Sequence, residues 1–277
     1  MNIAVLSGKG GTGKTFVSVN LSTVAQNSYY IDCDVEEPNG HLFFKPSDVF
    51  TEDVCVLLPK IDKQKCTGCR KCVDFCKFNA LAFIGKSPLI FKDICHSCGG
   101  CRTLCSANAI QGIEHSIGTI KTGKHKNITV ISGILNTGEE SGVPIIRKLL
   151  AKLGSSINVL DCPPGSACTV MESIKEADYC VIVAEPTAFG AHNFEMVHEL
   201  VTLLNKPFGV IINKSILPDN PMDKLCEKNN LTVLKHIDYN KDLAALNAQG
   251  LIACEENTDI KMMFEEILQK INEEVLK

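Results

Sequence analysis

A glycine-rich loop near the N-terminus constrains the fold of this chain more than any other feature. The apolar run Asn2–Leu6 predicts a short buried strand, and Gly8 to Thr15 follow it as G-x-x-x-x-G-K-T, opening a helix from Lys14. Glycines there let the backbone curl so that successive N–H groups point at phosphate oxygens, and the helix N-terminus adds positive potential. This order of strand, loop and helix favours a nucleotide phosphate site over a glycine-rich turn without a ligand.

The loop also suggests individual contacts with a nucleotide. Lys14 is expected to reach the β- and γ-phosphates, and the hydroxyl of Thr15 is expected to hold Mg²⁺. The other loop residues predicted to bind the nucleotide are Gly8, Lys9, Gly10, Gly11, Thr12, Gly13 and Phe16.

The rest of the chain alternates strand-like and helix-like patterns. Tyr29–Asp32 and Cys180–Ala184 read as buried strands, and Pro144–Leu153 and Ala188–Leu204 read as amphipathic helices. Such alternation predicts an α/β fold with a mostly parallel sheet and helices on both faces. Ligands of such folds bind at the carboxyl ends of the strands.

Cysteine is the compositional outlier, with fifteen residues in the chain. The N-terminus has no basic segment typical of a signal peptide, so we expect a cytoplasmic protein, in which metal ligation or redox chemistry is favoured over disulfides. Eight cysteines form C-x₂-C-x₂-C-x₃-C twice, repeated at an offset of 29 residues. This spacing is typical of two [4Fe–4S] clusters that exchange their fourth ligand.

The predicted ligands follow from that exchange. The first cluster takes Cys66, Cys69, Cys72 and Cys105, and the second takes Cys95, Cys98, Cys101 and Cys76. Zinc is the alternative, because C-x₂-C pairs also fit zinc, but the tandem repeat favours iron–sulfur. We place a ferredoxin-like insert at residues 60–115, within a main domain formed by residues 1–59 and 116–277.

Acidic residues follow two predicted strands. Asp32 and Asp34 come at the end of the strand that begins at Tyr29, and Asp161 ends an apolar run before Pro163-Pro164-Gly165. Carboxylates at strand ends beside a phosphate loop suit Mg²⁺ and phosphoryl chemistry.

Together, the loop and these acidic segments resemble the MinD/ParA superfamily of P-loop ATPases, which includes relatives of Mrp and of the nitrogenase iron protein. The resemblance implies ATP and Mg²⁺ as ligands, with Asp161 binding Mg²⁺ through water and Asp34 orienting the attacking water. Lys9 matches the additional lysine of that family's loop, which implies an ATP-dependent homodimer in which Lys9 acts across the interface. Asn213 matches a position that reads the adenine edge.

The resemblance and the cysteines together predict an ATP-hydrolysing iron–sulfur protein with Lys9, Lys14 and Asp34 as catalytic residues. Its dimer switch is expected to gate electron transfer through two [4Fe–4S] clusters to a redox partner protein. One alternative is a positioning or scaffold ATPase, and another is an ATPase of iron–sulfur or metallocofactor assembly. The net charge of −4 argues against nucleic acid. The absence of an apolar run of ~18 residues argues against membrane insertion.

Cys168 raises a further hypothesis, because it lies seven residues after Asp161. The nitrogenase iron protein has a cluster ligand at the matching place. That relative needs a second ligand upstream, and this chain has no cysteine between Cys105 and Cys162, so a cluster shared between subunits is not supported.

Overall fold

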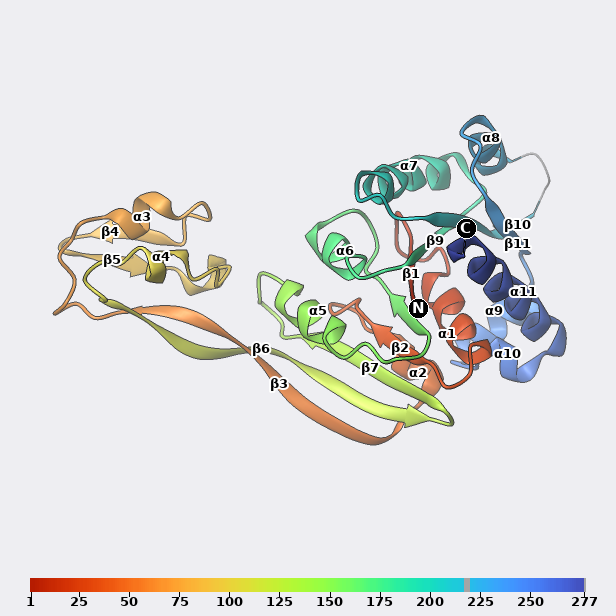
Figure 1. Ribbon diagram of the computed structural model, residues 1–277, viewed down its shortest axis with the longest axis horizontal. Helices are drawn as coiled ribbons and strands as arrows, with labels where there is room; N and C mark the ends of the chain where they lie inside the picture. The colour runs from red at the N-terminus through yellow and green to blue at the C-terminus, as the bar shows by residue number, and fades with distance from the viewer. Residues whose placement is uncertain (217–219, 277) are drawn as a thin grey trace.

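A nine-stranded sheet forms the centre of the computed structural model, which describes residues 1–216 and 220–276 (Figure 1). Its strand order is β11-β10-β9-β1-β8-β2-β7-β6-β3. The strands are β1 (Asn2–Leu6), β2 (Tyr29–Asp32), β3 (Ser47–Ile61), β6 (Ile110–His125), β7 (Ile128–Leu135), β8 (Asn158–Asp161), β9 (Tyr179–Ala184), β10 (Phe208–Ser215) and β11 (Val233–Asp238). Strands β11 to β7 in that order are parallel, whereas β6 and β3 continue the sheet antiparallel. The predicted α/β fold with a mostly parallel sheet is confirmed.

Helices cover both faces of the sheet. The helices are α1 (Lys14–Val24), α2 (Gly40–Phe44), α3 (Lys71–Phe75), α4 (Gly100–Thr103), α5 (Val143–Leu150), α6 (Cys168–Ser173), α7 (Ala188–Leu203), α8 (Pro221–Lys228), α9 (Lys241–Ala248), α10 (Ala253–Glu256) and α11 (Thr258–Val275), with a 3-10 turn η1 (Lys92–Ile94). Helices α5 to α8 supply apolar residues to one core, and α1 and α11 supply them to the other.

The central strand β1 shows why the sheet is covered on both sides. Ala4 and Leu6 point into the core under α5 to α8, whereas Ile3 and Val5 point into the core under α1 and α11, and all four are fully buried. A strand buried on both faces is apolar at every position, as parallel sheets require. The core therefore fixes β1, and with it the loop that follows, at the centre of the carboxyl edge of the parallel strands.

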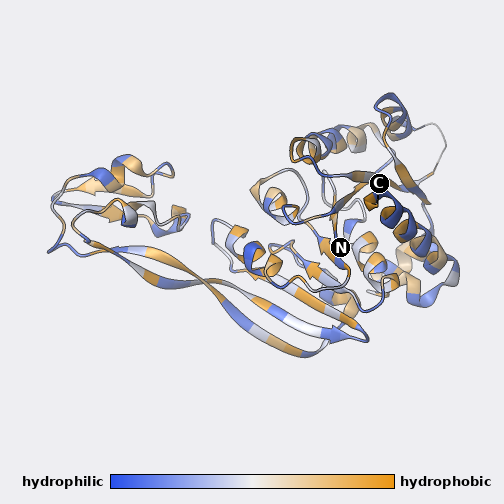
Figure 2. Cartoon of the chain, in the orientation of Figure 1, coloured by the Kyte–Doolittle hydropathy of each residue, from blue (hydrophilic) through white to orange (hydrophobic). Residues whose placement is uncertain are grey.

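The antiparallel strands β3 and β6 are much longer than the parallel ones and extend from the main sheet as a two-stranded ribbon (Figure 1). Their pairing runs from Ser47 opposite Lys124 to Ile61 opposite Ile110. Hydrophobic and hydrophilic residues alternate in bands along the ribbon (Figure 2). Gly118–His125 also pair with β7, and Val54 and Ile120 are buried in the main core, so the inner parts of the two strands belong to the main sheet and only residues 55–61 and 110–117 project as an arm.

The far end of the ribbon carries residues 62–109, here called the cysteine module (Figure 1). It contains α3, α4, η1 and a separate two-stranded sheet of β4 (Leu81–Ile84) and β5 (Ser87–Ile90). Its small core joins Cys72 and Cys101, one cysteine from each motif, with Leu81 and Ile110.

Among the described residues, no helix is long and apolar enough to cross a membrane.

Candidate functional site

The glycine-rich loop connects β1 to α1 and is held by neighbouring elements. The backbone approaches so closely that a Cβ atom at Gly8 would lie 2.1 Å from the carbonyl oxygen of Asn193. At Gly13, which precedes α1 with φ of 98°, a Cβ atom would lie 2.1 Å from Nδ2 of Asn213. Glycine is therefore required at both positions, the second also because of its left-handed backbone.

Thr12 provides an unpaired polar atom inside this loop. Its residue surface is only 3% exposed, and its Oγ1 has no hydrogen-bond partner in the described part of the chain. A buried hydroxyl without a partner is costly, so this atom fits a place where a ligand oxygen completes the loop.

Lys14 points to the acidic residues rather than into solvent. Its Nζ lies 2.7 Å from Oδ1 of Asp161 and 3.6 Å from Oδ2 of Asp34, which belong to the ends of two neighbouring strands. Burial acts to lower the pKa of Lys14, but the carboxylates of Asp161 and Asp34 outweigh it and raise the pKa above the ordinary value. The structure thus brings together three of the residues predicted to carry phosphoryl chemistry.

A second layer of contacts holds these carboxylates. The hydroxyl of Tyr30 donates to Oδ2 of Asp161 at 2.8 Å, and the backbone N–H of Gly40 donates to Asp32 at 3.0 Å. Asp32 is completely buried, and burial together with the charge of Asp161 raises its pKa well above the usual range. Burial likewise raises the pKa of Asp34, although Lys14 opposes the shift.

Lys9 forms an ion pair within its own chain in this structure. Its Nζ contacts Oε2 of Glu185, the residue that follows β9, and lies 5.7 Å from the ring centroid of Phe189. The other carboxylate oxygen of Glu185 accepts a hydrogen bond from Lys214 at 2.7 Å, and Lys214 also donates to the carbonyl of Gly11 at 2.6 Å. Burial acts to raise the pKa of Glu185, but these two lysines lower it below its ordinary value.

An apolar cavity of about 160 Å³ lies beside the loop. It is bounded by Gly13 and Phe16 on one side and by Asn213 and residues 237–247 on the other. Asn213 donates through Nδ2 to the carbonyl of Thr12 at 2.7 Å. Asn213, the residue predicted to read the base, therefore lines the cavity, and its amide nitrogen is hydrogen-bonded to the loop.

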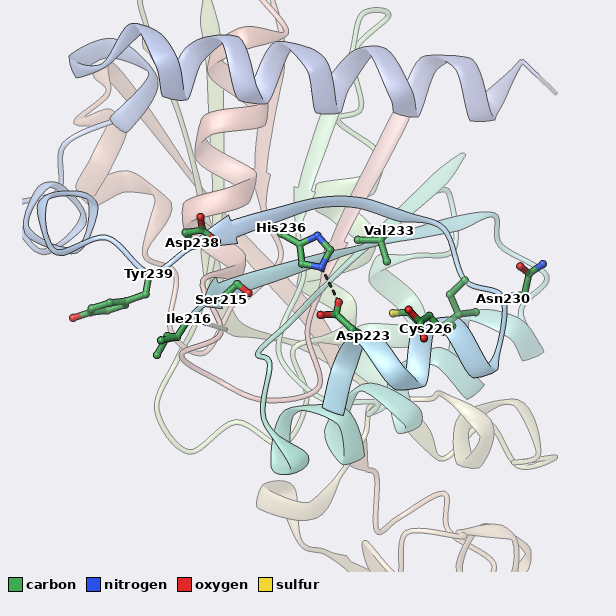
Figure 3. Close-up of a pocket in the computed structure, with 11 residues that line it drawn as sticks. Ser215, Ile216, Asp223, Cys226, Asn230, Val233, His236, Asp238 and Tyr239 are labelled. Carbon is green, nitrogen blue, oxygen red and sulfur yellow. Dashed lines mark hydrogen bonds and ion pairs between the residues drawn. The ribbon is translucent and has the colours of Figure 1, made fainter. Parts of the chain in front are cut away.

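A wider groove of about 1000 Å³ lies between α8 and the edge strand β11 (Figure 3). His236 and Asp223 face each other across it at 2.7 Å, and Glu227 and Asp238 add further carboxylates. No lysine or arginine lines it among the described residues. This acidic lining does not suit nucleotide phosphates, so the groove is not an alternative to the glycine-rich loop as a phosphate site.

Cysteines of the two motifs lie near one another in the module. Cys72 lies close enough to Cys69 and Cys105 to interact electrostatically with both, and burial is the largest cause that raises its pKa. In the same way, Cys95 interacts with Cys76 and Cys98.

A cavity of about 180 Å³ is lined by the four cysteines predicted for the second cluster. These are Cys76, Cys95, Cys98 and Cys101. Three come from the second motif and one from the first, and the cavity is otherwise mostly apolar. Such a donor set with space between the thiols fits a cluster better than it fits an ordinary core.

A site for a single metal ion is distinct from the cavity for a cluster. Within residues 1–216 and 220–276, no three His, Cys, Asp or Glu side chains are grouped so that they could hold a metal ion. The cluster ligands and the Mg²⁺ ligands Thr15 and Asp161 therefore remain predictions.

Sequence reasoning missed Tyr30 and Glu185. The signal for Glu185 was present, because it directly follows the buried strand β9, which pairs with β1. Residues after adjacent parallel strands meet at one edge of the sheet. Tyr30 gave no comparable signal, since an aromatic residue in a strand usually serves the core.

Comparisons with known proteins agree with this geometry. Residues 3–144 match the CobQ/CobB/MinD/ParA nucleotide binding domain. Two uncharacterized proteins of Methanocaldococcus jannaschii are similar: MJ0578 is 29% identical, covering 99% of this chain and 97% of its own, and MJ0579 is 32% identical, covering 79% and 82%. The Pyrococcus horikoshii septum site-determining protein MinD, solved with Mg-ADP, has a TM-score of 0.60 at 16% identity, covering 98% of this chain and 95% of its own.

Proposed function

Because the chain belongs to the CobQ/CobB/MinD/ParA nucleotide-binding family, we propose that it binds MgATP at the loop between β1 and α1 and hydrolyses it. The observation that carries this proposal is the position of Lys14, buried between Asp161 and Asp34 at the mouth of the loop. The unpaired Oγ1 of Thr12 supports it independently.

The proposed role of each residue in ATP hydrolysis follows from its charge. Lys14 would exchange Asp161 for the phosphate oxygens of ATP, which would leave Asp161, together with the hydroxyl of Thr15, to hold Mg²⁺. Asp34 lies beside Lys14 and orients the water that attacks the terminal phosphate. Mg²⁺ supplies neutralisation of the charge on the β- and γ-phosphates.

Lys9 connects hydrolysis to dimer formation in this proposal. It leaves Glu185 of its own chain and reaches the nucleotide of a second copy, where it stabilises charge on the transferred phosphoryl group. Glu185 keeps its second partner Lys214, so the carboxylate is not left unpaired.

The direct test is ATP hydrolysis by the purified chain, combined with sedimentation in ADP and in a non-hydrolysable ATP analogue. We expect hydrolysis that Lys14→Ala abolishes, and dimers with the analogue only. Hydrolysis at the wild-type rate in Lys14→Ala would exclude this loop as the site.

The cysteine module is the basis of a second proposed property, the binding of two [4Fe–4S] clusters. Its support is the cavity lined by Cys76 and three cysteines of the second motif, together with the proximity of Cys72 and Cys105. Bound clusters would supply one-electron chemistry, and the chain's thiolates would hold them and limit access of water. Iron and sulfide analysis of anaerobically purified protein tests this, with about eight iron atoms expected per chain.

Residues 136–142 support coupling between the two sites. The backbone N–H of Leu135 donates to the carbonyl of Val35 at 2.8 Å, next to Asp34, and a Cβ atom at Gly142 would lie 2.4 Å from Cγ2 of Val35. On their other side, Glu139 and Glu140 share a small cavity with Cys95 and its neighbours. A movement of Asp34 on ATP binding could therefore reach, through Val35 and this loop, the cavity beside the second cysteine motif.

Electron paramagnetic resonance of the reduced protein tests this route. We expect cluster signals to differ between ADP and the ATP analogue in the wild type. In Gly142→Ala this difference should diminish, whereas Thr137→Ala, at an exposed position of the same loop, serves as the control. If the cluster signals of the wild type are the same with ADP and with the ATP analogue, the proposed coupling is rejected, while the proposed nucleotide site and cluster sites are retained.

The family match and the fold concern nucleotide binding and not iron–sulfur chemistry. They therefore support the alternative of a positioning or scaffold ATPase more directly than they support electron transfer. An assembly ATPase for metal cofactors shares the same features. The three readings separate on one property: only the redox reading requires that reversible one-electron reduction of the module respond to nucleotide.

A further inference from the structure

The two cysteine motifs have different surroundings, and this difference is independent of the nucleotide site. The second motif faces the main domain, since Cys95, His96 and Ser97 share a cavity with Glu139 and Glu140 of the loop before α5. Of the first motif, Cys69 is exposed.

Charge is concentrated in the module. Residues 62–109 contain eight Lys and Arg against three Asp, which gives +5, while the whole chain carries −4 and the remainder therefore −9. Within the module, residues 63–71 contain four cations and no carboxylate. This stretch encloses Cys66 and Cys69, so the positive charge gathers at the first motif.

The fold adds a fifth cation to this group. The turn between β4 and β5 packs on the first motif, because a Cβ atom at Gly68 would lie 3.4 Å from the carbonyl oxygen of Lys86. Arg70 is fixed over the ring of Phe83 at 5.3 Å. We call the five exposed residues around Cys69 the basic collar: Lys63, Lys65, Arg70, Lys71 and Lys86.

Neutralisation of a cluster does not account for all of this charge. An oxidised [4Fe–4S] cluster with four thiolates carries about −2 and Asp62 adds −1, which leaves the collar with a net charge of about +2. Within the described residues, the only ion pair of the collar is Lys65 with Asp62 at 3.7 Å, an exposed pair of small energetic value. The other four cations are available to a partner.

We propose that the basic collar is the docking site for an acidic one-electron carrier protein, which exchanges electrons with the first cluster. The inference rests on the proposed clusters for its redox part but not for its docking part. One electron leaves the reduced centre of one protein and enters the oxidised centre of the other, so each changes by one electron. The acidic main domain repels such a carrier and directs it to the far end of the arm.

Docking is measured first, by fluorescence anisotropy of a labelled acidic flavodoxin added to the full-length protein as purified anaerobically. At about 0.01 M ionic strength we expect binding, which weakens at least tenfold at about 0.15 M because screening shortens the reach of the charges. Basic cytochrome c is the matched probe and should bind less tightly under the same conditions.

Two variants locate the site. Arg70→Glu/Lys71→Glu should weaken flavodoxin binding at least tenfold at low ionic strength, and Lys63→Glu/Lys65→Glu should do the same. Lys121→Glu/Lys124→Glu makes the same charge change on exposed positions of the ribbon and should leave binding unchanged. Equal weakening by all three, or tighter binding of cytochrome c, would overturn the proposal.

Iron content separates this inference from the proposed function. If the purified chain contains no iron but still binds flavodoxin through the collar, the docking site is retained and the proposed electron exchange is rejected. If the chain contains about eight iron atoms but its binding does not depend on the collar, only the docking site is rejected. Sedimentation without the probe tests the rival occupant: self-association that Arg70→Glu/Lys71→Glu abolishes would mean that the collar binds the acidic main domain of a second copy.

Discussion

Lys14 and Asp161 form a buried ion pair of 2.7 Å that ties the first turn of α1 to the end of β8. Side-chain exposure is 8% for the lysine and 1% for the aspartate. The residue expected to bind phosphate therefore neutralises the residue expected to serve Mg²⁺ in this structure. Each becomes available when the other receives its ligand, which links phosphate and Mg²⁺ binding at one pair.

Removal of the ammonium group should thus affect both binding and stability. Lys14→Ala leaves Asp161 buried with Tyr30 as its remaining partner, and loss of one member of a buried pair costs about 3–5 kcal/mol. We expect no measurable MgATP binding by calorimetry and a lower melting temperature. Circular dichroism at a temperature well below the melting point serves as the folding control, and retained tight binding would refute the site.

Lys9→Ala should separate nucleotide binding from hydrolysis. The variant retains Lys14 and the loop, so MgATP should still bind, but the dimer and its hydrolysis should be lost because the charge donated to a second copy is missing. Glu185→Gln is the informative companion, since it weakens the hold on Lys9 within its own chain. It should favour dimers at lower protein concentration, and normal hydrolysis by Lys9→Ala would refute the role across the interface.

Asn213 allows a distinction between reading the base and supporting the loop. Its amide donates to Thr12, so Asn213→Ala should weaken the binding of tripolyphosphate as well as ATP if loop support dominates. If the amide reads adenine, ATP binding alone should weaken, by about tenfold for a loss near 1.4 kcal/mol. Calorimetry with both ligands measures the difference, and unchanged affinity for both would remove Asn213 from the site.

The sequence predicted the centre of this protein much better than its arm. Local patterns define the parallel strands, because Ile3 and Val5 are buried on one face while Ala4 and Leu6 are buried on the other. The ribbon of β3 and β6 lacked such a signal. Its strands have partly exposed faces and pair across 48 intervening residues, 62–109, so the register depends on contacts that no local window contains.

The candidate site shows the same division. Motif residues Lys14, Asp34 and Asp161 could be grouped in advance, because the ends of adjacent parallel strands meet. The ion pair of Lys9 with Glu185 could not be, since it depends on the side-chain direction of a residue 176 positions away. Cysteine spacing indicates a repeated unit, whereas the crosswise ligand sets stay a prediction.

Asp34 should make stability depend on pH in a defined direction. Burial raises its pKa in the folded protein, so its contribution to stability is present below the ordinary aspartate pKa and is lost as the pH rises through the raised value. Asp34→Asn resembles the protonated form. The melting temperature of the variant minus that of the wild type should therefore be larger at pH 7 than at pH 4. For the exposed control Asp53→Asn, this difference should be the same at both pH values. A constant difference would mean that Lys14 fully compensates the carboxylate.

The crosswise assignment of cluster ligands gives a prediction that neither motif gives alone. Cys76 belongs to the first motif in sequence but lines the cavity with Cys95, Cys98 and Cys101. Cys76→Ala should thus lose about four iron atoms and leave the spectrum seen in Cys101→Ala, not the one seen in Cys66→Ala. Cys55→Ala, at an exposed cysteine on the ribbon, should retain all iron. If Cys76→Ala instead matched Cys66→Ala, each motif would hold its own cluster, and zinc in place of iron in the wild type would end the redox interpretation.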